Sequence, residues 1–219
     1  MMGTMVIELS LAVYALWRYK MSSVIRLAVI MLVMLAAFQL AEFQVCTGST
    51  LGGWHIDSWV WSRLGFAAIT LLPPLGIHLS YAMVDARRRP LVPVAYATGA
   101  VFALYFLTGA VTDHRCLGNY VIFQIAPGTG WLYELYYYGW LLVGMGLAWY
   151  LGRRVSKSRH RALTALMVGY ASFIIPTAAT YLMAPSVLAG IPSIMCGFGV
   201  FMALVVSLYA LPRSAKPRH

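Results

Sequence analysis

Residues 27–45 read LAVIMLVMLAAFQLAEFQV, an almost unbroken apolar run whose one charged side chain is Glu42. A helix needs ~20 apolar residues to cross a hydrocarbon core of ~30 Å, and it satisfies its backbone amides internally while doing so. Similar runs fill most of the remaining chain, at residues 5–17, 59–83, 91–111, 131–151, 162–183 and 191–211. We therefore predict an all-α, polytopic membrane protein in which residues 1–219 form one domain, a bundle of seven transmembrane helices.

The composition favours a membrane protein over a soluble one. Of the 219 residues, 61% are hydrophobic and 10% are charged, which is more apolar surface than one soluble core can enclose. Seven spans with short connections leave no stretch for a soluble catalytic domain. The first run has no charged segment or small-residue cleavage site before it, so we expect it to stay as a helix and not to be removed as a signal peptide.

Basic residues set the predicted orientation. The net charge of +10 does not indicate nucleic-acid binding, because the Lys and Arg residues lie between the apolar runs and not on a soluble face. Of these 16 residues, all except Arg63 and Arg115 fall in alternate connections or in the C-terminal tail. Cytoplasmic connections retain such residues and lie against anionic membrane lipids. We predict an external N-terminus and a cytoplasmic C-terminus.

The external connections are then residues 46–58, 112–130 and 184–190. The middle one is the longest, and it is long enough to fold back as a lid. Cys46 and Cys116 both fall on the external, oxidising side, so they are predicted to form a disulfide. An alternative is a metal site, because two adjacent connections supply suitable ligand types, although in no compact zinc spacing; these residues are His55, Asp57, Asp113 and His114.

Polar residues inside the apolar runs are candidates for a binding site, because ionisable groups in lipid are costly. Helical spacing places Gln39, Glu42 and Cys46 on one face and Arg63, Thr70 and His78 on another. We predict an outward-opening pocket lined by Gln39, Glu42, Arg63, Thr70, His78, Glu134, Tyr137 and Tyr138, with Ser172 and Thr177 beside it. The alternatives are a structural ion pair between Glu42 and Arg63, and a His78 that only holds helices together.

No complete catalytic or cofactor motif is present. The apolar runs contain neither a His pair for haem nor a late pair of His residues for a seven-helix metal hydrolase, and the last run has no Lys for retinal. The chain also lacks Gly-x-Ser-x-Gly and Cys-x-x-Cys. We therefore predict no cofactor and no enzymatic activity of these kinds.

The segment WSRLGFAAITLLPPL, residues 61–75, carries an aromatic residue and Arg63 at its outer end and ends in Pro73 and Pro74. It resembles the third helix of the seven-helix input region found at the N-terminus of many bacterial sensor histidine kinases. The resemblance implies a ligand-sensing module in a bacterial cytoplasmic membrane. The chain departs from that family because it stops at His219 without an output domain, so we expect either a separate signalling partner at the cytoplasmic connections or a module adapted to another task.

The sequence is compatible with three functions. The first is a receptor-like sensor that binds a small molecule or a lipid in the outward-facing pocket. The second is a small-solute transporter, which a polar stripe continuing from Thr70 through His78 to the cytoplasmic side would favour. A membrane-embedded, metal-dependent enzyme is the third.

Overall fold

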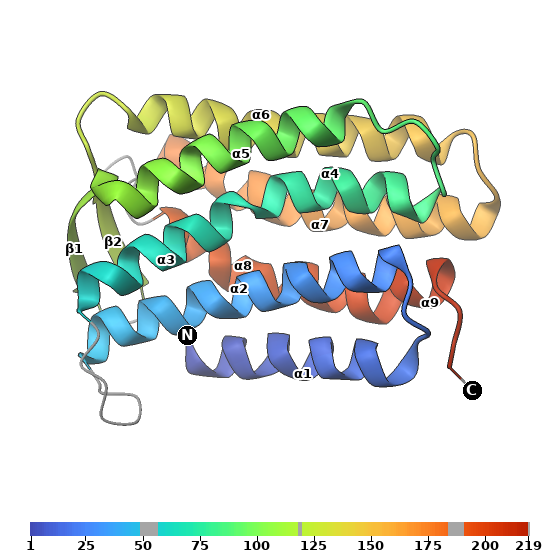
Figure 1. The fold of residues 1–219 in the computed structure, drawn as a ribbon, viewed down its shortest axis with the longest axis horizontal. Helices are drawn as coiled ribbons and strands as arrows, with labels where there is room; N and C mark the ends of the chain where they lie inside the picture. The colour runs from blue at the N-terminus through green and yellow to red at the C-terminus, as the bar shows by residue number, and fades with distance from the viewer. Residues whose placement is uncertain (49–56, 118–119, 184–190, 219) are drawn as a thin grey trace.

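The computed structural model describes residues 1–48, 57–117, 120–183 and 191–218, and it is mostly helical. Seven helical segments lie side by side along the long axis of the molecule (Figure 1). In chain order they are α1 (Met2–Arg18), α2 (Ser23–Thr47), α3 (Ser58–Thr70) followed by α4 (Leu72–Met83), α5 (Leu91–Tyr105) followed by the π-helical turn η1 (Phe106–Ala110), α6 (Gly130–Gly152), α7 (Lys157–Met183), and α8 (Ile191–Leu204) followed by the π-helical turn η3 (Val205–Ala210) and α9 (Leu211–Ser214).

Five of these segments are long and apolar enough to cross a membrane: Ser23–Thr47, Ser58–Met83, Leu91–Ala110, Lys157–Ala179 and Gly197–Ser214. The other two remain predicted spans. Helix α1 has 17 residues, and α6 is rich in Tyr, Trp and Gly, which are less apolar than Leu or Ile. The α3–α4 segment is the most enclosed of the five spans, whereas α5 is mostly exposed.

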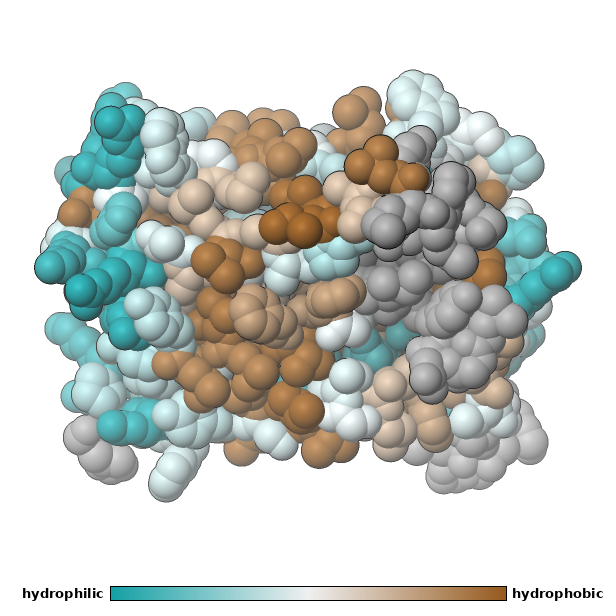
Figure 2. All heavy atoms as spheres, turned by 180° about the vertical axis from the view of Figure 1, so that it is seen from behind, coloured by the Kyte–Doolittle hydropathy of each residue, from teal (hydrophilic) through white to brown (hydrophobic). Residues whose placement is uncertain are grey.

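The surface has the distribution of side chains that a bilayer requires. Large apolar residues are exposed along the helices, for example Val13 and Ile175, each 65% exposed. Figure 2 shows them as a belt across the middle of the molecule, with hydrophilic residues at its ends. A soluble monomer rarely exposes apolar surface on this scale, so the belt is the face that lipid would cover.

Local sequence explains where the helices begin, end and break. Ser22 caps α2 by accepting a hydrogen bond from the Ile25 amide, and Gly48 ends that helix in the left-handed conformation at φ 57°. Asp57 caps α3 by accepting from the Trp59 amide. Pro73 and Pro74 open α4 and interrupt the hydrogen-bond ladder between α3 and α4.

The connection for which a lid was expected forms a β-hairpin of two strands, β1 (Val111–Leu117) and β2 (Tyr120–Ile125), which departs from the predicted all-α fold. The strands are antiparallel, with Val111 opposite Ile125 and His114 opposite Phe123. Val121 and Phe123 are buried while Gln124 is exposed, and this alternation with a period of two is what a half-buried strand requires. The Cys46–Cys116 disulfide is present and joins β1 to the end of α2, which confirms the predicted bridge.

The basic connections gather at the opposite end of the bundle. Lys20 N–H donates to the Lys216 carbonyl at 3.1 Å, so the connection after α1 pairs with the C-terminal tail. Arg159, beside the connection after α6, forms an ion pair with Asp85 of the connection after α4. We call this end, with residues 18–22, 84–90, 153–159 and 213–218, the basic end. The end with β1 and β2 is the hairpin end (Figure 1).

Candidate functional site

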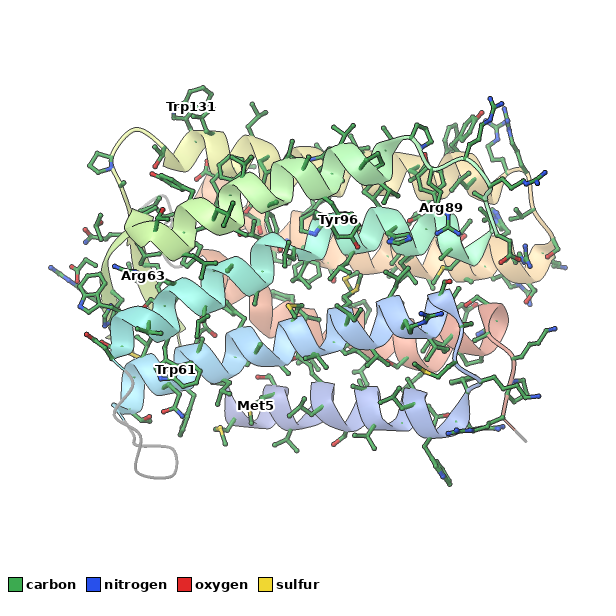
Figure 3. All side chains as sticks on the ribbon, in the orientation of Figure 1. Met5, Trp61, Arg63, Arg89, Tyr96 and Trp131 are labelled. Carbon is green, nitrogen blue, oxygen red and sulfur yellow. A yellow bond between two sulfur atoms is a disulfide. The ribbon has the colours of Figure 1, made fainter. Side chains whose placement is uncertain are left out.

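The predicted pocket residues do not form one group. Tyr137 and Tyr138 belong to the hydrophobic core, and Thr70 contacts Tyr133 of the same core. His78 instead contacts Arg89, which lies near the basic end (Figure 3). Arg63 and Glu42 lie on neighbouring helices but make different contacts.

Thr70 belongs to a structural hydrogen-bond network at the break between α3 and α4. The Thr70 carbonyl would normally accept from the amide four residues later, but that residue is Pro74, which has no N–H. Tyr136 of α6 replaces the missing donor, because its hydroxyl donates to the Thr70 carbonyl at 2.7 Å. The Thr70 hydroxyl donates to the Phe66 carbonyl and lies 3.1 Å from the Tyr133 hydroxyl. Thr70 therefore joins α3 to α6.

Tyr136→Phe is expected to lower the free energy of unfolding by about 2 kcal/mol, because it leaves the buried Thr70 carbonyl without a donor. Tyr105→Phe is the matched control: its hydroxyl bonds to the Thr129 side chain in a half-buried position, where water can replace it. Thermal and chemical unfolding of the purified variants would measure the difference. Equal losses in the two variants would contradict a special role for the Thr70 carbonyl.

Aromatic packing fills the space around this network. The rings of Phe66 and Phe106, and those of Phe106 and Tyr133, have centroids 4.8 Å apart. Tyr137 is buried beside Tyr133, with its ring centroid at 5.8 Å. Offset and edge-to-face contacts of this kind stabilise a core. Thr70 and Tyr137 therefore contribute to packing in this structure.

The remaining predicted pocket residues of α6 and α7 differ in their exposure and in their contacts. Glu134 is exposed on the outside of α6, close to the hairpin end. Tyr138 lies within hydrogen-bonding reach of Thr177, which joins α6 to α7. Ser172 donates to the Gly169 carbonyl within its own helix.

His78 takes part in contacts near the basic end. Its Nε2 lies 2.9 Å from Arg89 Nη1, and its Nδ1 lies 3.4 Å from the Tyr96 hydroxyl. Because a guanidinium group only donates, Nε2 is the acceptor and Nδ1 carries the proton. Both ring nitrogens thus contact neighbouring elements, which supports the structural alternative for His78 and separates it from the hairpin half.

Arg63 lies against the junction of η1 and β1. One of its guanidinium nitrogens is 3.2 Å from the position that a β-carbon would take at Gly109, whose φ of +115° is a left-handed conformation that glycine tolerates. Its buried Nε has no hydrogen-bond partner among the described residues. Among the described residues, the ion pairs are Arg159–Asp85 and Arg115–Asp113. The predicted alternative of an ion pair between Glu42 and Arg63 is therefore not found there.

The residues of the metal alternative have local roles where they are described. Asp57 caps α3, Asp113 accepts from the His114 amide, and His114 packs edge-on against Trp59 with ring centroids 5.0 Å apart. His55 lies outside the described residues. Within the described ranges, no three His, Cys, Asp or Glu side chains come together as metal ligands.

The most unusual polar group in the bundle is Glu8 of α1. Its side chain is 0% exposed, and neither carboxylate oxygen has a hydrogen-bond partner among the described residues. Its Oε1 faces Gly199 of α8, 3.6 Å from the position that a β-carbon would take there. Leu35 of α2 and Phe173 of α7 approach the same point. Helices α1, α2, α7 and α8 therefore meet at this point.

A second acidic side chain lies near the first. Glu42 of α2 is 1% exposed and close enough to Glu8 for the two carboxylates to interact electrostatically. Gln39, one turn along the same helix, is also buried. A buried carboxylate without a partner among the described residues, as Glu8 is, is balanced by taking up a proton or by binding a cation.

Sequence reasoning placed Glu42 and Gln39 correctly on one buried face but omitted Glu8 from the site. The sequence feature that points to Glu8 is that it is the one acidic residue in the first apolar run, residues 5–17. In Figure 1, α1 begins inward of the hairpin ends of α2 and α3, and Glu8 lies about 9 Å further along its axis. The site therefore lies deeper in the bundle than the sequence suggests.

No protein-family model, curated protein or solved structure matches this chain in sequence or fold comparisons.

Proposed function

We propose that this protein is a receptor-like membrane sensor that binds a small cationic solute at Glu8 and Glu42. The observation that carries the proposal is the Glu8 carboxylate, which is completely buried and has no hydrogen-bond partner in the described part of the chain. A buried carboxylate without a partner lowers stability by several kcal/mol in general. A binding role for Glu8 would explain why the protein retains a buried carboxylate that lowers its stability, which packing alone does not explain.

The orientation in this proposal places the hairpin end outside and the basic end in the cytoplasm. It rests on the Lys and Arg residues gathered at one end of the bundle. The resemblance of residues 61–75 to the input regions of bacterial sensor kinases supports the same orientation and a bacterial cytoplasmic membrane. A solute would then approach the carboxylates from outside.

Three features provide a route by which occupancy of the site changes the basic end. Helix α3 breaks at Pro73 before it continues as α4, α7 contains Pro176, and α8 runs from Gly199 into the π-helical turn η3. Helices bend at such positions. A cation that binds one arrangement of these helices better than another would shift their populations, and a separate partner would detect the change at the basic connections.

Glu8→Gln tests the proposal. We expect the substitution to change the free energy of unfolding without ligand by about 1 kcal/mol or less, because without a cation the buried carboxylate takes up a proton and the neutral Gln amide has a similar size. The matched control is Glu134→Gln, which changes an exposed carboxylate on α6 and is expected to alter stability by less than about 0.5 kcal/mol.

The binding measurement uses the purified full chain and its thermal midpoint in the presence of sodium, potassium, alkyl amines and polyamines. At least one of these cations is expected to raise the midpoint of the unchanged protein and of Glu134→Gln in a saturable manner. Glu8→Gln should not respond. If Glu8→Gln responds as the unchanged protein does, the carboxylate is not the site.

A transporter is the second candidate, because buried carboxylates also mark cation and proton pathways. Saturable uptake of the effective cation into proteoliposomes, lost in Glu8→Gln, would select the transporter. Binding without uptake would select the sensor.

A further inference from the structure

A second feature, independent of the acidic pair, is an open groove of about 440 Å³ between α7 and η3. It begins near the basic end and continues toward the middle of the membrane-facing surface. The α7 residues that line it are His160, Arg161, Thr164, Ala165 and Val168, and η3 contributes Val205 and Tyr209. Figure 2 shows the side of the molecule on which α7 and α8 lie.

The groove changes from basic to apolar along its length. Arg161, in the second turn of α7, is exposed, whereas Ala165, Val168 and Val205 form an apolar floor further along. Arg161 and Val168 are separated by about 10 Å along the helix axis, from a rise of ~1.5 Å per residue. Val168 is 47% exposed and belongs to the apolar belt that lipid would cover. This gradient matches a phospholipid, whose anionic phosphate lies at the interface and whose chains lie in the hydrocarbon.

A second basic residue strengthens the positive charge at the same end. Arg213 lies over the Tyr209 ring, with its guanidinium carbon 3.5 Å from the ring centroid, and donates to the Tyr209 carbonyl at 2.8 Å. The Ser158 hydroxyl donates to the Arg213 carbonyl, which joins the start of α7 to α9. Tyr209 is thereby held at the edge of the groove. Arg161 belongs to neither of the ion pairs found among the described residues.

We propose that this groove binds one anionic phospholipid, with its phosphate at Arg161 and an acyl chain along Ala165, Val168 and Val205. Basic residues at the ends of membrane helices attract anionic headgroups with ~1 kcal/mol each. The π-helical turn that supplies Val205 and Tyr209 is a local feature often found at functional sites. The site is separate from Glu8 and does not depend on the cation-sensing proposal.

The experiment titrates the purified full chain with dioctanoyl phosphatidylglycerol, which is anionic, and dioctanoyl phosphatidylcholine, which is zwitterionic, and counts bound lipid by native mass spectrometry. The unchanged protein is expected to bind the anionic lipid about fivefold more tightly. Arg161→Gln should remove that preference, and its control is Arg88→Gln, a basic residue in the connection after α4, which should keep it.

A second pair of variants tests the apolar floor. Val168→Trp fills the groove and should weaken the binding of both lipids. Ile175→Trp, two turns further along α7 and 65% exposed, should bind both as the unchanged protein does. The proposal would be overturned if the unchanged protein bound the two lipids with equal affinity, or if Arg161→Gln and Arg88→Gln lost the preference for the anionic lipid equally. It would also be overturned if inorganic phosphate alone raised the thermal midpoint of the protein as much as the anionic lipid does.

Discussion

Gly76→Ala is expected to lower the free energy of unfolding by about 3 kcal/mol, because a β-carbon at residue 76 would overlap the Tyr170 hydroxyl oxygen. Tyr170 is 1% exposed and lies between α4 and α6. On its other side, a β-carbon at Gly144 would be 2.8 Å from Tyr170 Cζ. The ring therefore has no free space on either side, and α4 and α6 would have to separate.

A double variant distinguishes this overlap from a general effect of replacing glycine. In Tyr170→Phe the overlapping oxygen is absent, and the nearest remaining ring atom, Cζ, is 3.1 Å from the new β-carbon. Gly76→Ala should then cost much less than it does alone, which unfolding of the two single variants and the double variant in detergent would measure. Gly146→Ala, with no atom within 4 Å of its β-carbon, is the control and should be neutral or slightly stabilising. A loss in Gly146→Ala as large as in Gly76→Ala would contradict the prediction.

This packing also explains why helix association here depends on small residues. In lipid the apolar effect does not drive helices together, so close approach and shape decide the arrangement. Gly65 lies against Ala41 and Phe38, and Gly169 lies against Met202, in the same way that Gly76 receives Tyr170. A sequence shows that such glycines are present but not which aromatic side chain each one receives.

The helices themselves were predictable, because apolar runs of sufficient length have few alternatives. The predicted run 27–45 lies within α2, and 59–83 became α3 and α4, with the break at the two prolines. The hairpin was not predicted, since the expectation for that connection was a lid of undefined structure. Its alternation of Val121 and Phe123 with polar or exposed neighbours was visible, but a single short strand pattern does not identify its partner.

The candidate site was only partly predictable, because the rotation of each helix decides which polar residues meet. Spacing placed Arg63 and His78 on one side of a continuous helix, yet the Pro73–Pro74 break separates their surroundings. Arg63 contacts Gly109, and His78 contacts Arg89. Glu8 was recognisable as an ionisable group in an apolar run, but its position opposite Gly199 depends on tertiary packing.

Replacing both Cys46 and Cys116 with Ser is expected to lower the free energy of unfolding by about 3 kcal/mol. The disulfide joins residues 70 apart in sequence, and closing a loop of that length contributes ~4 kcal/mol when the whole chain unfolds. Helices that remain inserted in detergent or lipid already restrict part of that loop, which reduces the expected value. The double variant avoids leaving a free thiol. Cys196→Ser, in α8, is the control and should retain the bridge.

The reductant dependence of unfolding separates the disulfide from the substitution itself. Reducing agent should lower the thermal midpoint of the unchanged protein to that of the double variant and leave the double variant unaffected. Cys46 lies one turn beyond Glu42 on α2, so release of the hairpin should also weaken the cation response that depends on Glu8. If reduction lowers stability but leaves that response intact, the hairpin stabilises the outer end without shaping the site. An unchanged midpoint, with three free thiols by alkylation before reduction, would refute the bridge.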